Sequence, residues 1–189
     1  MLWQDLLKIR TEAPLIHNIT NYVAMNITAN ALLAIGASPV MSHAPEEVEE
    51  MTSLARALVL NLGTLSVPWI ESMLKAGRTA LQAGIPIVLD PVGSGATQFR
   101  TSTARQLIQQ IPPAIIRGNA SEIRSLVLDE KGTKGVDSRH TPEETVEAAR
   151  CLSERRDCVV SVSGAIDHIV EKEVAIKTLN GHPVMPRIT

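Results

Sequence analysis

The sequence predicts an α/β fold of three layers, in which a mostly parallel sheet is flanked by helices. Short apolar runs alternate with longer helical patterns along almost the whole chain, and this succession is typical of a layered α/β sheet. The runs at 57–63 (ALVLNLG) and 85–91 (IPIVLDP) are apolar without alternation, as in strands that are covered on both faces. A length of 189 residues favours a single domain over 1–189.

In the first half of the chain, strands and helices are expected in strict alternation. The predicted strands are 14–18, 38–41, 57–63 and 85–91. The predicted helices are 21–35, a helix that opens at Pro45, and 68–83. Gly36 and Gly84 stand where C-terminal caps belong, because glycine adopts the left-handed conformation that ends many helices. The acidic residues that follow Pro45 suit the positive end of a helix dipole.

The second half continues the alternation and ends in a hairpin. The predicted strands are 114–119 and 158–164, the predicted helices are 101–110, one from Ala120, and 142–156, and 167–179 forms an edge hairpin. Thr141 to Glu144 is a capping box with proline at the first helical position, so a helix starts there. The stretch 129–139 is rich in glycine and charge, and we expect it to be the most mobile loop.

Composition argues against several classes of partner. Only 2% of the residues are aromatic and the net charge is −2, so the chain has neither a stacking platform nor an electrostatic footprint for nucleic acid. The two cysteines, Cys151 and Cys158, fit no metal or redox motif and read as thiols of a reducing compartment. No secretory leader and no apolar run of about 18 residues is present. We therefore expect a cytoplasmic protein with no membrane partner.

Polar residues and glycines gather where the predicted strands end, which is where open α/β sheets bind ligands. They are His17, Asn18, Thr20, Asn21, Met41, Asn61, Gly63, Thr64, Asp90, Gly93, Gly95, Arg117, Gly118, Asn119, Glu122, Ser161, Ser163 and Gly164. No Walker loop, dinucleotide fingerprint, HExxH or GxSxG motif occurs among them.

Each of these residues has a structural reading beside the functional one. Asp90 initiates a turn or binds a ligand. Gly93 and Gly95 supply left-handed turn positions, or backbone N–H groups for an anion. Glu122 complements a helix dipole or, with Asp90, holds Mg²⁺ directly or through water. Arg117 closes an apolar strand and favours an anionic partner such as phosphate. Met41 belongs to the core or to the wall of an apolar pocket.

Five strings, in this order and spacing, carry a family resemblance. They are LIHNITNYVAMNITANALLAIGASPVMSHAPEEVEEM, LVLNLGTL, IVLDPVGSGAT, IIRGNASEI and KGVDS. Over essentially the whole chain they resemble the hydroxyethylthiazole kinase family. The resemblance implies a ribokinase-like fold, and phosphorylation of the hydroxyl of 4-methyl-5-(2-hydroxyethyl)thiazole by ATP and Mg²⁺ in thiamine biosynthesis or salvage. It also implies homotrimers with active sites at subunit interfaces.

The family's site residues are carried over only where the strings match. Met41 matches a thiazole-contacting methionine, Asn21 and Val23 match positions that line the same pocket, and Gly63 resembles part of its wall. For ATP, Arg117 matches the arginine that contacts the phosphates. Ser163 stands where the family usually has threonine beside the nucleotide, and because serine keeps the hydroxyl we expect nucleotide binding to survive.

The metal side and the catalytic segment complete the comparison. Asp90 and Glu122 match acids of the Mg²⁺–phosphate region. Residues 180–189 lead up to the family's Thr-Gly-x-Gly-Cys segment, which forms the anion hole, and the sequence ends at its threonine, Thr189. Cys151 and Cys158 do not match the family's cysteine. The resemblance therefore places no catalytic residue in the chain and implies that these residues alone are inactive.

Two other functions stay open at this point. One is a related kinase for another small alcohol, such as a pyrimidine. The other is a non-catalytic subunit that binds thiazole or serves in assembly.

Overall fold

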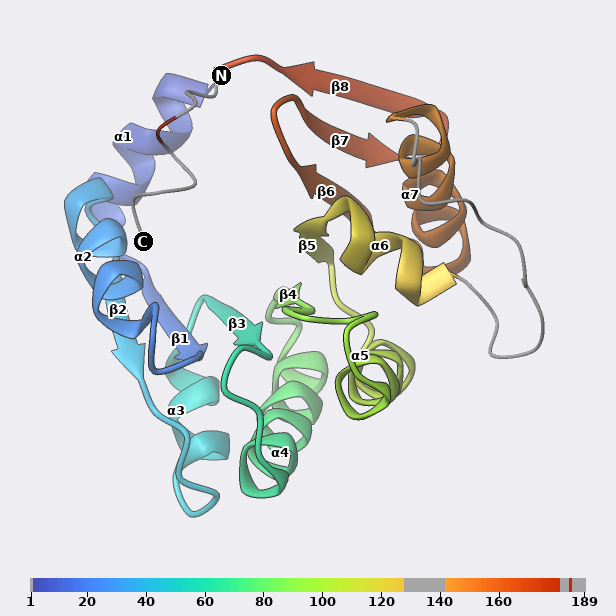
Figure 1. Ribbon diagram of the computed structural model, residues 1–189. Helices are drawn as coiled ribbons and strands as arrows, with labels where there is room; N and C mark the ends of the chain where they lie inside the picture. The colour runs from blue at the N-terminus through green and yellow to red at the C-terminus, as the bar shows by residue number, and fades with distance from the viewer. Residues whose placement is uncertain (1, 128–141, 181–183, 185–189) are drawn as a thin grey trace. The chain divides into compact units, whose positions relative to one another are not determined.

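The computed structural model describes residues 2–127, 142–180 and 184. The chain forms two compact units, an N-terminal unit of residues 1–88 and a C-terminal unit of residues 89–189. Figure 1 labels the elements of both. Each unit is described by itself.

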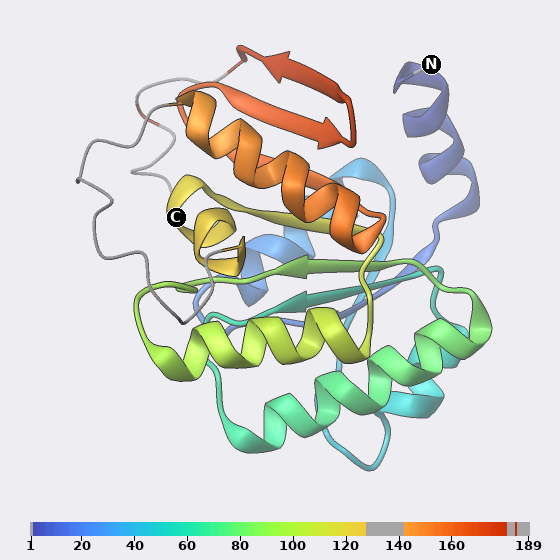
Figure 2. The same ribbon diagram turned by 90° about the vertical axis from the view of Figure 1, so that its right-hand side faces the viewer.

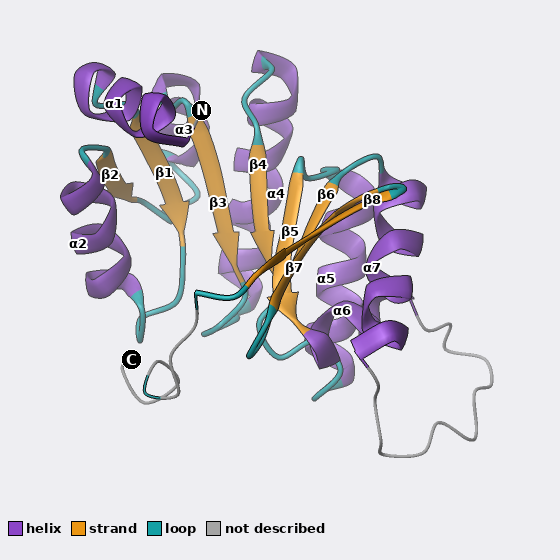
Figure 3. Ribbon diagram, turned by 90° about the horizontal axis from the view of Figure 1, so that it is seen from above, coloured by secondary structure: helices purple, strands orange, loops and turns teal. Residues whose placement is uncertain are grey.

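The N-terminal unit is built on parallel strands in the order β2-β1-β3-β4. Its elements are α1 (Leu2–Glu12), β1 (Leu15–Ile19), α2 (Met25–Ile35), β2 (Ser38–Met41), α3 (Val48–Leu54), β3 (Ala57–Asn61), α4 (Val67–Ala83) and the start of β4 (Ile87–Asp90). Strand β1 pairs in parallel with β2 and with β3, so that Asn18 lies opposite both Met41 and Val59. The three arrows point the same way in Figure 3.

The helices of this unit lie on both faces of its strands. The chain passes from β1 through α2 to β2 on one side, and returns from β2 through α3 to β3 on the other side of β1. Right-handed crossovers therefore place α2 and α3 on opposite faces. Helices α3 and α4 pack against each other and against β1. The expected layered α/β arrangement is confirmed.

The C-terminal unit continues from the end of β4 in the order β5-β6-β7-β8. Its further elements are α5 (Gln98–Gln110), β5 (Ile115–Asn119), α6 (Ala120–Val127), α7 (Pro142–Arg156), β6 (Val159–Ser163), β7 (Asp167–Glu171) and β8 (Val174–Thr178). Strands β5 and β6 are parallel, whereas β6, β7 and β8 are antiparallel, which confirms the predicted edge hairpin. Helix α7 packs on β6 and β7 (Figure 2).

The predicted helix ends agree best where glycine marks them. Gly36 and Gly84 cap α2 and α4 in the left-handed conformation, with φ of 99° and 68°. Starts agree less well, because α2 begins at Met25 and α3 at Val48, each after a turn. Helix α1 had not been predicted, and none of its residues is buried. Thr141 and the stretch 129–139 lie outside the described residues.

Both cores are aliphatic, as the few aromatic residues predict. The fully buried side chains include Ile19, Leu58, Leu60, Leu62 and Met73 in the N-terminal unit, and Leu107, Ile108, Ile111, Ile116 and Ile123 in the C-terminal unit. Along β3, Leu58 and Leu60 are fully buried and the alternate residues are half-buried. Strand β5 alternates likewise, which leaves Arg117 and Asn119 on an exposed face. Within the described residues, no helix is both long and apolar enough to cross a bilayer.

Candidate functional site

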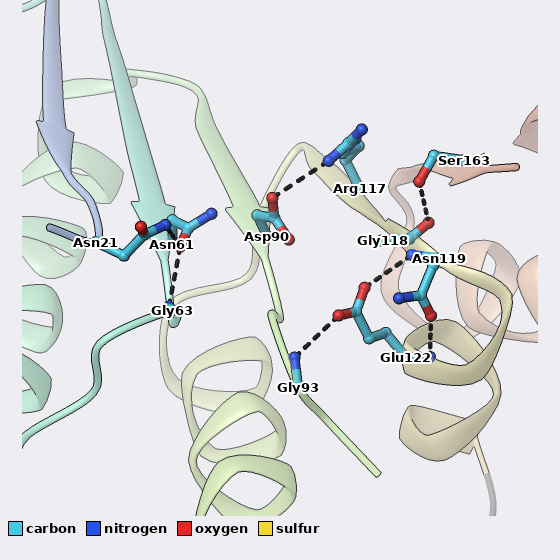
Figure 4. A network of polar contacts seen from close by, with 10 residues as sticks. All are labelled: Asn21, Asn61, Gly63, Asp90, Gly93, Arg117, Gly118, Asn119, Glu122 and Ser163. Atoms are coloured by element: carbon cyan, nitrogen blue, oxygen red, sulfur yellow. Dashed lines mark hydrogen bonds and ion pairs between the residues drawn. The ribbon is translucent and has the colours of Figure 1, made fainter. Parts of the chain in front are cut away.

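In the N-terminal unit, three predicted polar positions after β1 and β3 form one hydrogen-bonded group (Figure 4). The Asn21 amide nitrogen Nδ2 donates to Asn61 Oδ1 over 2.7 Å, and the backbone N–H of Gly63 donates to the same oxygen over 2.9 Å. The other end of the Asn21 amide, Oδ1, accepts from the backbone N–H of Ala24 over 2.8 Å. We call Asn21, Asn61 and Gly63 the asparagine clamp.

Gly63 has no room for a side chain at this place. A Cβ atom on Gly63 would lie 2.5 Å from Asn21 Cβ and 2.7 Å from Asn21 Nδ2, which is closer than real Cβ contacts come. Glycine at position 63 thus lets the backbone after β3 approach the Asn21 side chain, and its role in the wall of a thiazole pocket stays a prediction.

Met41 and Val23 are the other two residues that the sequence predicts on the thiazole side. Met41 is the last residue of β2 and is half-buried, opposite Asn18 on β1. Val23 lies in the turn that leads into α2, and the residue is 71% exposed. Such an exposed valine becomes a pocket residue only when another surface covers it.

Buried polar side chains hold the backbone carbonyls of the loop after Met41. His17 is fully buried, and its Nε2 lies 2.9 Å from the Ser42 carbonyl oxygen while its Nδ1 lies 2.9 Å from Thr52 Oγ1. Because a carbonyl only accepts, Nε2 carries the proton. Burial lowers the pKa of the His17 imidazole, against the opposing effects of the Ser42 carbonyl and Glu47. Ser72 Oγ holds the next carbonyl, that of His43, at 2.7 Å.

Three rings gather beside the same loop, and the sequence had not predicted this. The Tyr22 ring lies 5.1 Å from the Trp69 ring and 6.4 Å from the His43 ring, centroid to centroid. His43 and Trp69 are 4.8 Å apart. The cluster ties together the segments that follow β1, β2 and β3, because one ring comes from each.

In the C-terminal unit, Arg117 and Asp90 are brought together. Arg117 Nη1 on β5 lies 3.5 Å from Asp90 Oδ2 at the end of β4. Figure 4 shows the guanidinium group turned towards the carboxylate. The exposed position of Arg117, 54% of its side chain, leaves the cation accessible to an anionic ligand.

Glu122 forms a capping box and also holds the turn after β4. Its Oε2 accepts from the backbone N–H of Asn119 over 2.8 Å, while Asn119 Oδ1 accepts from the N–H of Glu122 over 3.0 Å. Its Oε1 accepts from the N–H of Gly93 over 2.9 Å. Both carboxylate oxygens therefore serve the backbone, and each keeps a further lone pair for a metal-bound water.

The turn after β4 does not offer the anion site that its glycines suggested. Gly93 and Gly95 are left-handed, with φ of 75° and 92°, as their reading as turn positions requires. The N–H of Gly95 donates to Thr101 Oγ1 over 2.8 Å, and those of Ser94 and Ala96 donate to carbonyls within the turn. With the N–H of Gly93 bound to Glu122, all four N–H groups of residues 93–96 have acceptors, which favours the reading of the two glycines as turn positions.

Ser163 ends β6 opposite Asn119 of β5. Its hydroxyl donates to the Gly118 carbonyl over 3.4 Å, a long hydrogen bond that a better acceptor would readily replace. Ser163 thus lies on the same strand pair as Arg117, whose partner in the register is Ser161.

The remaining titratable groups add no metal cluster. Within the described residues, no group of three or more His, Cys, Asp or Glu side chains could hold a metal ion. Neither thiol belongs to the sites above: Cys158 is buried, and burial raises its pKa to about 11.

Of the residues of the asparagine clamp, Asn61 is recognised in the sequence only as a residue that ends a strand. Its signal, an asparagine that ends an apolar strand, does not reveal a partner 40 positions away.

Comparison with known proteins gives one consistent result. A model described as the hydroxyethylthiazole kinase family matches residues 6–189. The hydroxyethylthiazole kinase of Oleidesulfovibrio alaskensis is 55% identical over 188 residues, which covers 100% of this chain and 71% of the relative. That of Syntrophus aciditrophicus is 53% identical over 188 residues and covers 99% of this chain and 70% of the relative.

Solved structures agree with this at two levels. A hydroxyethylthiazole kinase protein from Pyrococcus horikoshii matches with a TM-score of 0.89 at 42% identity, over 99% of this chain and 70% of that one. A phosphomethylpyrimidine kinase from Clostridium difficile matches with a TM-score of 0.65 at 15% identity, over 88% of this chain and 85% of that one. The second likeness shows a shared fold alone and confirms the ribokinase-like class.

Proposed function

The chain belongs to the hydroxyethylthiazole kinase family, and from this premise we propose that it transfers the γ-phosphoryl group of ATP to the hydroxyl of 4-methyl-5-(2-hydroxyethyl)thiazole in thiamine biosynthesis. The observation that carries the proposal is the ion pair between Arg117, in the middle of β5, and Asp90, at the end of β4. An accessible cation beside a carboxylate, on an exposed strand face, suits the binding of a metal–polyphosphate.

On the nucleotide side, Arg117 pairs with the phosphates of ATP. A guanidinium group binds phosphate oxygens through several N–H donors and neutralises charge as the phosphoryl group moves. Ser163 supplies a hydroxyl beside the nucleotide, in place of the weak bond to the Gly118 carbonyl.

The residues present fit a Mg²⁺ ion that is held mostly by water and phosphate. Mg²⁺ in kinases takes one or two carboxylates and otherwise keeps its waters or binds phosphate oxygens. Asp90 is the residue that would contact the ion, and Glu122 would act through water because both its oxygens already accept backbone N–H groups. Bound there, the ion would offset phosphate charge.

The residues proposed to line the thiazole pocket are Met41, Asn21, Val23 and Gly63. Met41 offers a polarisable apolar surface for a sulfur-containing aromatic ring. Asn21, 8% exposed, and Gly63 give the pocket a rigid edge, since hydrogen bonds and close packing fix both.

The exposed valine supports a homotrimer whose sites are completed at subunit interfaces. Val23 and, on α2, Ile27 and Leu33 are 71%, 52% and 59% exposed, and apolar patches of this kind mark interaction surfaces. Light scattering coupled to size exclusion tests this on the full-length protein, and a monomer at micromolar concentration would overturn it. ATP as co-substrate and free thiols both suit the proposed cytoplasmic location.

Turnover by the full-length protein tests the proposed reaction. Purified protein with ATP and Mg²⁺ is expected to phosphorylate hydroxyethylthiazole, detected by mass spectrometry of the product, and to use a hydroxymethylpyrimidine at least about 10²-fold less efficiently. A preference for the pyrimidine would favour the related kinase. Calorimetric binding of the thiazole by a folded protein without turnover would favour the non-catalytic subunit.

A further inference from the structure

The asparagine clamp joins Asn21 and Gly63, two residues of the proposed thiazole pocket, through Asn61, to which no role in that pocket has been given above. Asn61 Oδ1 accepts both from Asn21 Nδ2, over 2.7 Å, and from the Gly63 N–H, over 2.9 Å. An amide oxygen has two lone pairs, so these two donors satisfy it. The end of β3 thereby fixes the residue after β1 and its own outgoing backbone at once.

The clamp also determines which way the Asn21 amide faces. Asn21 Oδ1 accepts from the Ala24 N–H over 2.8 Å, so the oxygen is committed to the turn that leads into α2. One hydrogen of Nδ2 is committed to Asn61. If Asn61 did not accept there, the amide would lose one of the two contacts that distinguish its ends, and 180° rotation would cost less.

Packing makes the orientation matter. Asn21 is 8% exposed, and its side chain already lies where a Cβ on Gly63 would collide with it. A change in the Asn21 rotamer therefore moves the backbone after β3 or the turn before α2, and both carry proposed pocket residues. A misplacement of about 1 Å in a positioned site lowers activity by about 10².

We propose that Asn61 is a positioning residue of the thiazole pocket, which fixes Asn21 and the backbone of Gly63 in the arrangement that receives the substrate ring. The inference rests on the proposed function for its substrate. Asn61 acts through Asn21 rather than through its own contact with the thiazole.

A double-substitution cycle tests this on the full-length enzyme. Asn61→Ala is expected to raise the KM for hydroxyethylthiazole by about tenfold, the usual effect of one lost hydrogen bond between well-placed groups, and to leave the KM for ATP within about twofold. In the Asn21→Ala background, Asn61→Ala is expected to raise this KM by less than it does alone, because the contact with Asn21 is already gone and only the bond to the Gly63 N–H remains to be lost. Independent, multiplying effects, or a thiazole KM within about twofold of wild type, would overturn the proposal.

Two further variants separate positioning from loss of folding. Asn61→Asp keeps an oxygen that accepts both N–H groups, and is expected to restore at least about half of the lost thiazole affinity on a logarithmic scale. The matched control is Ser53→Ala, which removes an exposed hydrogen bond of 2.8 Å to the Glu49 carbonyl on α3 and is expected to change neither KM.

Amide hydrogen exchange tests the asparagine clamp independently of whether the protein phosphorylates the thiazole. In the wild type, the Gly63 and Ala24 amides are expected to exchange slowly by NMR, and Asn61→Ala is expected to speed exchange at Gly63 by about tenfold or more. If the wild-type protein does not phosphorylate hydroxyethylthiazole, the proposed function fails while this exchange result still decides the clamp. Unchanged exchange at Gly63 in a folded Asn61→Ala variant would overturn the clamp itself.

Discussion

Arg117 and Asp90, on the neighbouring strands β5 and β4, form an ion pair in which Nη1 lies 3.5 Å from Oδ2. The pair joins the residue proposed for the phosphates to a residue proposed for Mg²⁺. Binding of a metal–nucleotide must therefore separate them. Arg117 then exchanges the Asp90 carboxylate for a phosphate group, and Asp90 exchanges the Arg117 guanidinium group for Mg²⁺. The contact is long and Arg117 is 54% exposed, so little free energy opposes this exchange.

Arg117→Gln is accordingly expected to impair ATP use far more than folding. An exposed ion pair adds about 0–1 kcal/mol to stability, whereas loss of a cation at a transferring phosphoryl group lowers the rate by about 10²–10³. Urea unfolding should give a free energy within about 1 kcal/mol of the wild type, and kcat/KM for ATP should fall by at least about 10². Arg155→Gln, at the exposed end of α7, is the control. Equal losses of stability and activity would contradict the assignment.

Glu122 is expected to behave as a structural residue even without Mg²⁺. Its two oxygens accept the N–H groups of Asn119 and Gly93, and glutamine replaces one of these oxygens by an NH₂ group that cannot accept. Glu122→Gln should therefore lower the free energy of unfolding by about 1–3 kcal/mol, measured by urea unfolding in EDTA. Glu154→Gln on α7, an exposed glutamate, is the matched control. Stability equal to wild type in EDTA would mean that Glu122 serves the metal alone.

Helix ends and strands were predictable where one residue decides the local backbone. Gly36 and Gly84 ended their helices as expected, because a left-handed φ favours glycine over any residue with a Cβ. Strand 38–41 was predicted with its observed bounds. The start of α2 was placed too early because the Asn21 side chain binds the Ala24 N–H, which makes a turn where periodicity suggests a helix. Helix α1 buries no residue and so lacks a face that a pattern could reveal.

The site was predictable as a set of strand-end residues, but not as a set of contacts. Parallel strands bring their carboxyl ends to one edge, and this led to Asp90, Arg117 and Glu122. Which atoms meet depends on side-chain orientation between residues far apart in sequence: Asn61 meets Asn21 across 40 positions, and Glu122 meets Gly93 across 29. For this reason the sequence left open whether the glycine turn offers N–H groups to an anion, and it did not reveal that Glu122 accepts from Gly93 and Thr101 from Gly95.

The Cys158 thiol should be almost unreactive at neutral pH. Burial raises its pKa to about 11, so only about 10⁻³ of it is thiolate at pH 8. With Cys151→Ser in place to remove the half-buried thiol, labelling by a disulfide reagent should be slow at pH 8 and should rise about tenfold per pH unit towards pH 11. The reverse variant, Cys158→Ser, leaves Cys151 as the control. Rapid labelling of Cys158 at pH 7 in the folded protein would contradict its buried, neutral state.

His17 is expected to make the protein less stable in mild acid. Burial lowers the pKa of its imidazole in the folded state, whereas the unfolded value is about 6.5. The unfolded chain therefore binds the proton first as pH falls. The stability that neutral His17 contributes is complete above about pH 6.5, and it declines by up to about 1.4 kcal/mol per pH unit down to the folded pKa.

Urea unfolding between pH 7.5 and 5 should show this slope, in a pH range that lies above the titration of ordinary carboxylates. His17→Gln should lower stability at pH 7.5, because it disrupts the contacts to Ser42 and Thr52, and should flatten the slope while the other four histidines remain. An unaltered slope in the variant would assign the acid sensitivity to another group.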